Sequence, residues 1–309
     1  MVGVESMGAA RRWWYALKPA SWPKVFVPAL FGQAMGAASA GRWSVGALAW
    51  GVLWTALDIT FIVLLNDWGD REVDALKRRM FPRGCSPKTI PDGILPARAL
   101  LLAGLGAGAG ALVLAGAAGA ALARPLLLPL AALSLFIFAA YTLPPLRLNY
   151  RGGGELLEMV GVGGVLPVLH AYAQCGQWAP QALLTWAPGL LALCLASALA
   201  SGLSDEESDR AGGKRTFTTW LGNAAVRRAS EGLLLAGAVL WLGMGQWGSL
   251  AALPVVFFSA RAWRKSPEAV TNAFAAQGAY KLELHRAIWW GTLVLSGLVL
   301  VERWWGGAR

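Results

Sequence analysis

Long apolar stretches separated by short polar connections run through the whole chain. Mostly apolar runs of about 20 residues, the length that an α-helix needs to cross a bilayer, occupy nine ranges: 23–41, 44–66, 97–122, 125–144, 155–175, 180–203, 224–245, 248–264 and 285–304. The range 97–122 is rich in Gly and Ala, which is typical of membrane helices that pack closely. The pattern predicts an all-α transmembrane protein, a nine-helix bundle around a central cavity.

The first 22 residues differ from the rest. Arg11, Arg12 and Lys18 surround Trp13, Trp14 and Tyr15, a mixture that suits a segment lying on the bilayer surface. A signal peptide has a short apolar core soon after its charges, whereas here the apolar run starts only near residue 23 and continues as a full span. We expect an uncleaved interfacial segment, 1–22, followed by a single domain, 23–304.

Composition agrees with a membrane protein. Of the 309 residues, 56% are hydrophobic and 14% charged, against about 25% charged in soluble proteins. Cys85, Cys175 and Cys194 are an odd, widely spaced set, and His170 and His285 are the only histidines. The sequence therefore predicts neither disulfides nor a transition-metal site.

The chain has a net charge of +10, and its Lys and Arg residues lie mostly on one side of the predicted membrane spans. Of the 27 Lys and Arg residues, 23 fall at connections on one side of the predicted bundle, and Arg42, Arg124, Arg303 and Arg309 fall on the other. The positive-inside rule then places the N-terminus in the cytoplasm. We expect a multi-pass protein of the cell inner membrane with its polar motifs on the cytoplasmic side. Membrane orientation accounts for the positive charge, so we do not expect the protein to bind nucleic acid.

Acidic residues gather where the second apolar range ends. Asn66, Asp70 and Asp74 are spaced i, i+4, i+8, so on one helix they form a stripe with Asp67 beside it. Stacked carboxylates repel one another unless a cation holds them. Oxygen ligands without clustered His or Cys favour a hard cation, and Mg²⁺ keeps positions open for phosphate oxygens. The stripe predicts a diphosphate–Mg²⁺ site at the membrane surface.

A second acidic cluster follows the sixth apolar range. Asp205 and Asp209 are again four residues apart, and Lys214 follows them. A single cluster of this kind is usually a solvated loop of mixed charge. Two clusters at corresponding depths on the same predicted membrane face instead favour one shared site.

Basic residues near both clusters are candidates to hold the diphosphate oxygens that metal ions leave free. They are Arg71, Lys88, Arg147, Arg151, Lys214 and Arg215. Membrane topology alone also explains most of them. Lys88 and Lys214 are the stronger candidates, because each follows an Asp cluster at the centre of a loop.

These motifs resemble the UbiA superfamily of intramembrane prenyltransferases from about residue 12 to 304. The similar segments are Asn66-Asp67-x-x-Asp70-x-x-x-Asp74, the loop Lys88-Thr89-Ile90-Pro91-Asp92-Gly93, Asp205-x-x-x-Asp209-Arg210 with Gly213-Lys214-Arg215-Thr216, and Lys18-Pro19 with Trp22-Pro23. The resemblance implies that the two Asp boxes bind Mg²⁺ and that Lys18 joins the diphosphate-binding residues.

Within the superfamily, the segment from Tyr141 through Pro144-Pro145 and Arg147 to Arg151 looks most like the MenA group, which prenylates dihydroxynaphthoate. It makes Tyr141 and Arg147 candidates to contact diphosphate or acceptor. The prolines also end a helix and start a rigid loop, whatever else the segment does.

One departure from that group lies before the second box. The MenA group has a segment similar to Asn-Asn-x-Arg-Asp there, whereas this chain reads Ser201-Gly202-Leu203-Ser204-Asp205. A second metal ion then has fewer protein ligands, and the acceptor pocket differs. This fits a relative that prenylates another compact bicyclic phenol, such as a quinolone or a naphthalene polyol.

Asp58 lies inside the second apolar range, where a charge is costly. It either orients or deprotonates the acceptor, or is protonated and hydrogen-bonded to a neighbouring helix. Trp54, Phe61, Phe136 and Phe138 likewise either line a prenyl tunnel, where their rings stabilise an allyl cation, or pack against helices and lipid.

The predicted reaction is Mg²⁺-dependent transfer of a prenyl group from an allylic diphosphate to a ring carbon of a bicyclic aromatic acceptor. The first alternative is a terpene cyclase or diphosphatase that uses the same site without an acceptor. A cation-coupled transporter fits less well, because transporters usually bind ions near the bilayer midplane, and here the carboxylates are at helix ends.

Overall fold

The computed structural model describes residues 7–86, 88–268 and 274–305, and all regular elements in these ranges are helical. The long helices are α2 (Pro23–Ala40), α3 (Val45–Gly69), α5 (Ala97–Ala121), α6 (Leu127–Thr142), α10 (Gln181–Ser201), α13 (Asn223–Leu242), α14 (Gln246–Lys265) and α15 (Phe274–Trp305). A further run joins α8 (Gly154–Val160), a π-helical turn (Gly161–Val165) and α9 (Leu166–Cys175). Short helices complete the chain: α1 (Ala9–Leu17), α4 (Arg71–Met80), α7 (Leu148–Arg151), α11 (Glu206–Ala211) and α12 (Phe217–Leu221).

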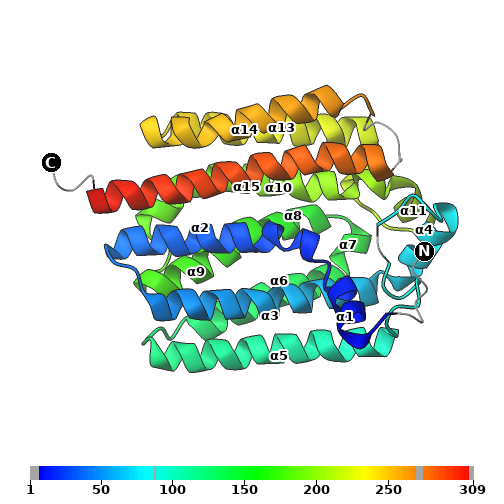
Figure 1. Ribbon diagram of the computed structural model, residues 1–309, viewed down its shortest axis with the longest axis horizontal. Helices are drawn as coiled ribbons and strands as arrows, with labels where there is room; N and C mark the ends of the chain where they lie inside the picture. The colour runs from blue at the N-terminus through cyan, green and yellow to red at the C-terminus, as the bar shows by residue number, and fades with distance from the viewer. Residues whose placement is uncertain (1–6, 87, 269–273, 306–309) are drawn as a thin grey trace.

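The long helices lie side by side as a bundle, with α5 and α14 at opposite edges of the view (Figure 1). Each of the nine predicted ranges coincides with one of these helices or with the α8–α9 run. By length and composition, five of the described helical segments can cross a membrane: Val45–Gly69, Ala97–Ala121, Gly154–Cys175, Gln181–Ser204 and Phe274–Trp304. The number of membrane spans therefore stays a prediction.

Helix α15 is longer than its apolar range predicted. The predicted range begins at residue 285, but the helix begins at Phe274. The added turns carry polar residues that are fully buried, Tyr280 and Glu283 among them. Because these residues are polar, the apolar pattern did not include them in the predicted helix, although they pack inside the protein.

The apolar core forms two clusters that share α2. One joins α2 to α10, α13, α14 and α15, and the other joins α2 to α3, α5, α6 and α9. Helix α2 is almost wholly buried and contacts α9 and α15. It can lie so close to α9 because of two glycines: a Cβ at Gly32 would lie 2.3 Å from the Pro167 carbonyl oxygen, and one at Gly36 would lie 2.4 Å from that of Ala171.

Large apolar side chains are exposed on the outer helices. They include Leu102 and Val113 on α5, Leu133 and Phe136 on α6, and Leu253 and Phe257 on α14. A soluble monomer rarely exposes so much apolar surface, whereas a bilayer covers it. The outer surface therefore agrees with a protein embedded in lipid.

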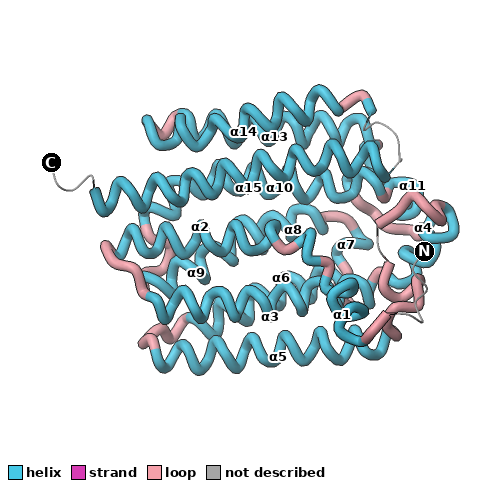
Figure 2. Tube along the Cα trace, viewed as in Figure 1, coloured by secondary structure: helices cyan, strands magenta, loops and turns pink. Residues whose placement is uncertain are grey.

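The polar parts of the chain gather at one end of the bundle. Helices α1, α4, α7 and α11 and the loops between them lie together there, and the last described residues of α15 lie at the opposite end (Figures 1 and 2). Helix α4 packs against α11, and α7 against α8. Both acidic clusters belong to this end, as the sequence predicted.

Candidate active site

A cavity of about 330 Å³ opens at the polar end of the bundle. Its walls come from α2, α3, α6, α8, α10 and α11 and from the loop after α11. Nine of the predicted site residues line it: Lys18, Asp58, Asn66, Asp67, Asp70, Tyr141, Asp205, Asp209 and Lys214. Six predicted residues are not among those that line it: Arg71, Asp74, Lys88, Arg147, Arg151 and Arg215.

The first acidic box spans two helices. Helix α3 ends at Gly69 and α4 begins at Arg71, with Asp70 between them at φ −93° and ψ 3°. The prediction of one continuous helical stripe is therefore wrong. Because the helix breaks at Asp70, Asn66, Asp67 and Asp70 line the cavity, while Asp74 is buried beside the loop that follows α4.

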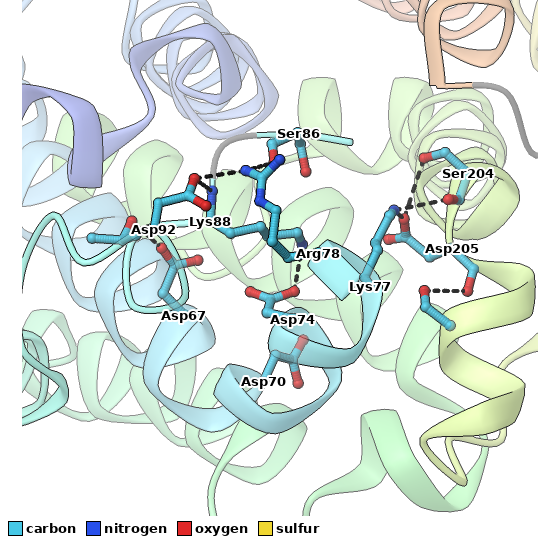
Figure 3. Close-up of polar contacts among 12 residues, drawn as sticks. Asp67, Asp70, Asp74, Lys77, Arg78, Ser86, Lys88, Asp92, Ser204 and Asp205 are labelled. Atoms are coloured by element: carbon cyan, nitrogen blue, oxygen red, sulfur yellow. Dashed lines mark hydrogen bonds and ion pairs between the residues drawn. The ribbon is translucent and has the colours of Figure 1, made fainter. Parts of the chain in front are cut away.

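Each carboxylate of this box is paired with a lysine from another part of the chain. Lys18 contacts Asp67, Lys88 contacts Asp74, and Lys214 Nζ lies 2.7 Å from Asp70 Oδ2. Figure 3 shows Lys88 reaching down to Asp74. The site therefore neutralises its own acidic groups.

Two neutral side chains complete this shell. Thr89 donates to Asp67 at 2.6 Å, and Asn149 donates to Asp70 at 3.3 Å. Lys18, which ends α1, has a left-handed backbone conformation (φ 46°), a state that costs a non-glycine residue roughly 1 kcal/mol or more. This strained backbone conformation occurs at the residue whose ammonium contacts Asp67.

The second box starts where α10 ends. A single 3₁₀ turn, Gly202–Ser204, leads to Asp205, and α11 carries Asp209. Lys77 of α4 contacts Asp205 and donates to the Ser204 carbonyl at 2.8 Å (Figure 3). Sequence reasoning missed Lys77, although its spacing from Asp70 and Asp74 places it on the same side of α4.

The two boxes meet at Lys214. Its ammonium contacts Asp70, and although burial opposes the charged form, Asp70 and Asp209 together raise the pKa of Lys214 above its usual value. Burial raises the pKa of Asp209 to about 6, against the opposing charge of Lys214. Two segments more than 130 residues apart thus share one electrostatic site.

Burial dominates the remaining ionisable groups at this end. It raises the pKa of Asp74, and Lys88 opposes that shift. Burial likewise lowers the pKa of Lys77, whereas the Asp205 carboxylate and the Ser204 carbonyl accept hydrogen bonds from its ammonium and so favour the charged form.

Two predicted basic residues have structural contacts outside the cavity, and a third is exposed. Arg147 donates to the Gly69 carbonyl at 3.0 Å and lies 3.8 Å over the Tyr150 ring, so it holds the C-terminal end of α3. Arg71 donates to the Trp68 carbonyl at 2.8 Å. Arg151 is exposed. Their diphosphate-binding role stays a prediction.

The deeper wall is apolar with a few polar groups. Tyr141 and Phe138 line it, with their rings stacked at 5.6 Å between centroids. Asp58 also lines it, is 2% exposed, and its Oδ1 atom has no hydrogen-bond partner among the described residues. No hydrogen bond to a neighbouring helix therefore satisfies that oxygen.

The aromatic predictions divide. Phe138 lines the cavity, and Phe61 packs edge-on against it at 5.9 Å. Phe136 is 60% exposed on the outer face of α6, and Trp54 is fully buried against His170. Lining the tunnel was therefore the wrong interpretation for Phe136 and Trp54.

A group of polar side chains lies between α2, α8 and α10, and of these the sequence did not single out Lys24. Lys24 donates at 2.8 Å to Glu158 and at 2.8 Å to Ser201, and all three residues line the cavity. Glu155, one turn away, accepts from the Phe217 backbone N–H at 2.8 Å. Ser201 is the residue at which the second box departs from the MenA pattern.

Within the described ranges, no three His, Cys, Asp or Glu side chains form a ready metal cluster. The oxygen-bearing side chains that line the cavity nevertheless include Asn66, Asp67, Asp70, Asp205 and Asp209. Such a set suits a hard cation such as Mg²⁺, once Lys18 and Lys214 exchange their carboxylate contacts for phosphate oxygens.

Comparison with known proteins decides the family. The sequence model of the UbiA prenyltransferase family matches residues 25–268, most of the chain. The chain belongs to the UbiA prenyltransferase family. The predicted superfamily is thereby confirmed.

Curated relatives are two chloroplastic chlorophyll synthases. The Arabidopsis thaliana protein is 26% identical over 81% of this chain, and the Oryza sativa subsp. japonica protein is 29% identical over 66% of it. The chain spans 66% and 54% of the length of these two relatives. Neither bears on the dihydroxynaphthoate subgroup, which stays a prediction.

The fold agrees with solved structures. A UbiA homolog from Archaeoglobus fulgidus bound to DMAPP and Mg²⁺ superposes with a TM-score of 0.66 over 92% of this chain and 99% of that one, at 16% identity. At this identity the likeness shows the fold: an all-helical UbiA-type membrane protein.

Proposed function

We propose that this chain transfers a prenyl group from an allylic diphosphate to a ring carbon of a bicyclic aromatic acceptor, with Mg²⁺ as cofactor. The observation that carries the proposal is the convergence of Asp70 and Asp209 on Lys214 at the mouth of a cavity with apolar walls. The homolog bound to DMAPP and Mg²⁺ and the chlorophyll synthases support the donor, the metal and the reaction class.

The residues at the mouth would hold the diphosphate end of the donor. Asn66, Asp67, Asp70 and Asp209 would hold Mg²⁺, which when bound draws electrons from the diphosphate and helps it to leave. Lys18 and Lys214 line the cavity and donate to the outer phosphate oxygens. Arg71, Asp74, Lys88, Arg147, Arg151 and Asp205 would support this arrangement from outside or from the rim.

The deeper wall would hold the reacting carbon. The bond between the prenyl carbon and the diphosphate oxygen breaks, and its electron pair leaves with the diphosphate. A ring carbon of the acceptor supplies the electrons for the new C–C bond, and its proton then leaves. The rings of Tyr141 and Phe138 face the allyl cation, and the apolar wall excludes water that would quench it.

Asp58 is the group proposed to act on the acceptor. It lines the cavity below the first box and carries an oxygen without a partner. Its carboxylate accepts a proton from an acceptor hydroxyl, which makes the ring carbon more nucleophilic. The compact acceptor is proposed to be dihydroxynaphthoate-like, or a quinolone or related phenol.

The proposed topology follows the charge pattern. Nine spans within a single domain, 23–304, put the N-terminus and the cavity mouth on the cytoplasmic side of the cell inner membrane. Reporter fusions after residue 151 and after residue 245 should report cytoplasmic and external locations respectively, and the reverse result would refute the orientation.

The test of function is a direct assay. Purified protein with Mg²⁺, farnesyl or geranylgeranyl diphosphate and a panel of bicyclic phenols should form a prenylated phenol. Asp70→Ala and Asp209→Ala should abolish transfer, while Glu72→Ala, which removes a largely exposed carboxylate of the same segment, should not. Folded Asp70→Ala and Asp209→Ala proteins that still transfer would contradict the proposal. Products formed from labelled diphosphate alone would indicate a cyclase or diphosphatase instead.

A further inference from the structure

Lysines from three distant helices converge on the second box. Lys24 of α2 donates to Ser201 Oγ at 2.8 Å, and Lys281 of α15 donates to Ser204 Oγ at 2.8 Å. Lys77 of α4 donates to the Ser204 carbonyl and contacts Asp205. Ammonium groups thus contact the hydroxyls of Ser201 and Ser204 and one carboxylate oxygen of Asp205.

The contacts at Ser204 and Asp205 form one connected network. The Ser204 hydroxyl accepts from Lys281 and donates to Asp205 Oδ1 at 3.3 Å, and the same carboxylate oxygen receives Lys77. Lys24, Ser201 and Glu158 form a second group beside it, in which Lys24 pairs with the Glu158 carboxylate. Lys24 and Lys77 each pair with one carboxylate, Glu158 and Asp205 respectively, and Lys281 adds a third positive charge at the Ser204 hydroxyl.

The first box differs in where its lysines can go. Lys18 and Lys214 line the cavity, so each can leave its carboxylate for a phosphate oxygen when the donor binds. Lys77 and Lys281 are not among the residues that line it. If Lys77 left Asp205, its buried ammonium would lose the carboxylate that contacts it, which is strongly unfavourable.

We propose that Lys24, Lys77 and Lys281 take the place of a second divalent ion, so that the chain binds one Mg²⁺ at the first box. The proposal rests on the function proposed above and specifies its metal content. A divalent cation beside Asp205 would lie within a few ångströms of the fixed Lys77 ammonium and be repelled by it. Lys24, which lines the cavity, then holds the far side of the diphosphate directly.

The inference also gives a physical reason for the unusual second box. Ser201 and Ser204 stand where the MenA pattern has an amide and an arginine. An uncharged hydroxyl can accept a hydrogen bond from lysine, whereas an arginine at the Ser204 position would repel Lys77 and Lys281. The serines and the lysines therefore belong together.

The experiment counts Mn²⁺ bound to the purified chain. Equilibrium dialysis, with electron paramagnetic resonance of unbound Mn²⁺, is done in the presence of an unreactive geranyl thiolodiphosphate. Wild type should bind one Mn²⁺ per chain. Lys77→Met should bind two, with the second site at least tenfold tighter than any second site of wild type. Arg79→Met, which removes an exposed charge from the same helix, should bind one, and thermal unfolding in detergent checks that each variant is folded.

The outcomes separate this proposal from the proposed function. Two ions in wild type would overturn the inference and leave prenyl transfer untouched. One ion in wild type and one in a folded Lys77→Met protein would also overturn it, because Lys77 would not then be what excludes the second. No bound ion in any variant would instead refute the Mg²⁺-dependent function. If Lys77→Met does not fold, Lys281→Met takes its place as the variant expected to bind a second ion, and one ion in a folded Lys281→Met protein would then overturn the inference.

Discussion

Lys214 gives the sharpest test of the site, because it is the side chain at which the two acidic boxes meet. Its Nζ lies 2.7 Å from Asp70 Oδ2, and it is 9% exposed. At that separation, two unit charges attract by about 6 kcal/mol for an effective dielectric constant near 20, before the loss of hydration is subtracted. Lys214→Met removes this charge and keeps most of the side-chain volume.

Two effects of Lys214→Met should be measurable. A charge-assisted hydrogen bond to the leaving diphosphate contributes about 1.5–3 kcal/mol, so kcat/KM for the prenyl diphosphate should fall by a factor of roughly 10 to 150. The ligand-free protein should also become less stable by up to about 3–5 kcal/mol, because Asp70 loses its counter-charge. The additional Asp70→Asn change should restore part of this stability but no activity.

The assay is steady-state transfer from labelled diphosphate at saturating acceptor, together with thermal unfolding in detergent. Arg215→Met is the matched control, because Arg215 is the next residue, carries the same charge and is exposed. Equal losses of kcat/KM in Lys214→Met and Arg215→Met would refute the reasoning, since only the general positive field would then matter. So would a Lys214→Met protein with wild-type kcat/KM.

Three further predictions test other parts of the molecule. Asp58→Asn should raise KM for the acceptor or lower kcat while leaving KM for the diphosphate unchanged, and full turnover with unchanged acceptor affinity would exclude a catalytic Asp58. Gly36→Ala should lower the unfolding temperature, because its Cβ would lie 2.4 Å from the Ala171 carbonyl oxygen and overpacking costs about 1–3 kcal/mol; Gly106→Ala, with nothing within 4 Å, is its control, and equal shifts would contradict the packing argument. Chelation of divalent ions should stop transfer, and Mg²⁺ should restore it; transfer that persists after chelation would refute the metal requirement.

The helices and the end of the bundle that carries the chemistry could be predicted from sequence, because both depend on composition over about 20 residues. The meeting of Asp70 and Asp209 was also predictable. Each follows an apolar run on the same predicted membrane face, and helices of one bundle bring such ends together. That Asp74 lies outside the cavity could not be predicted. The break between α3 and α4 falls at Asp70, and the i, i+4, i+8 pattern of the sequence gives no sign of it.

The orientation of aromatic side chains could not be predicted for a different reason. Phe136 and Phe138 are two residues apart on α6, yet Phe136 is exposed while Phe138 lines the cavity. In a soluble helix, polar residues would mark the outer face. In a membrane helix lipid replaces water, both faces are apolar, and the periodic signal that separates inside from outside disappears.

The role of three lysines at the second box could not be recognised from the sequence, because the positive-inside rule already accounted for their positions. Lys24, Lys77 and Lys281 fit the positive-inside pattern, so each looked like a topology signal, yet each contacts an oxygen of the second box. An acidic cluster at the edge of an apolar bundle is costly unless its charge is balanced, and here lysines balance it. On the proposed function, a lysine that lines the cavity exchanges a carboxylate for a phosphate when the donor binds, whereas a lysine behind the wall keeps its carboxylate. Whether a lysine reaches the cavity therefore decides whether it binds substrate or holds the site together.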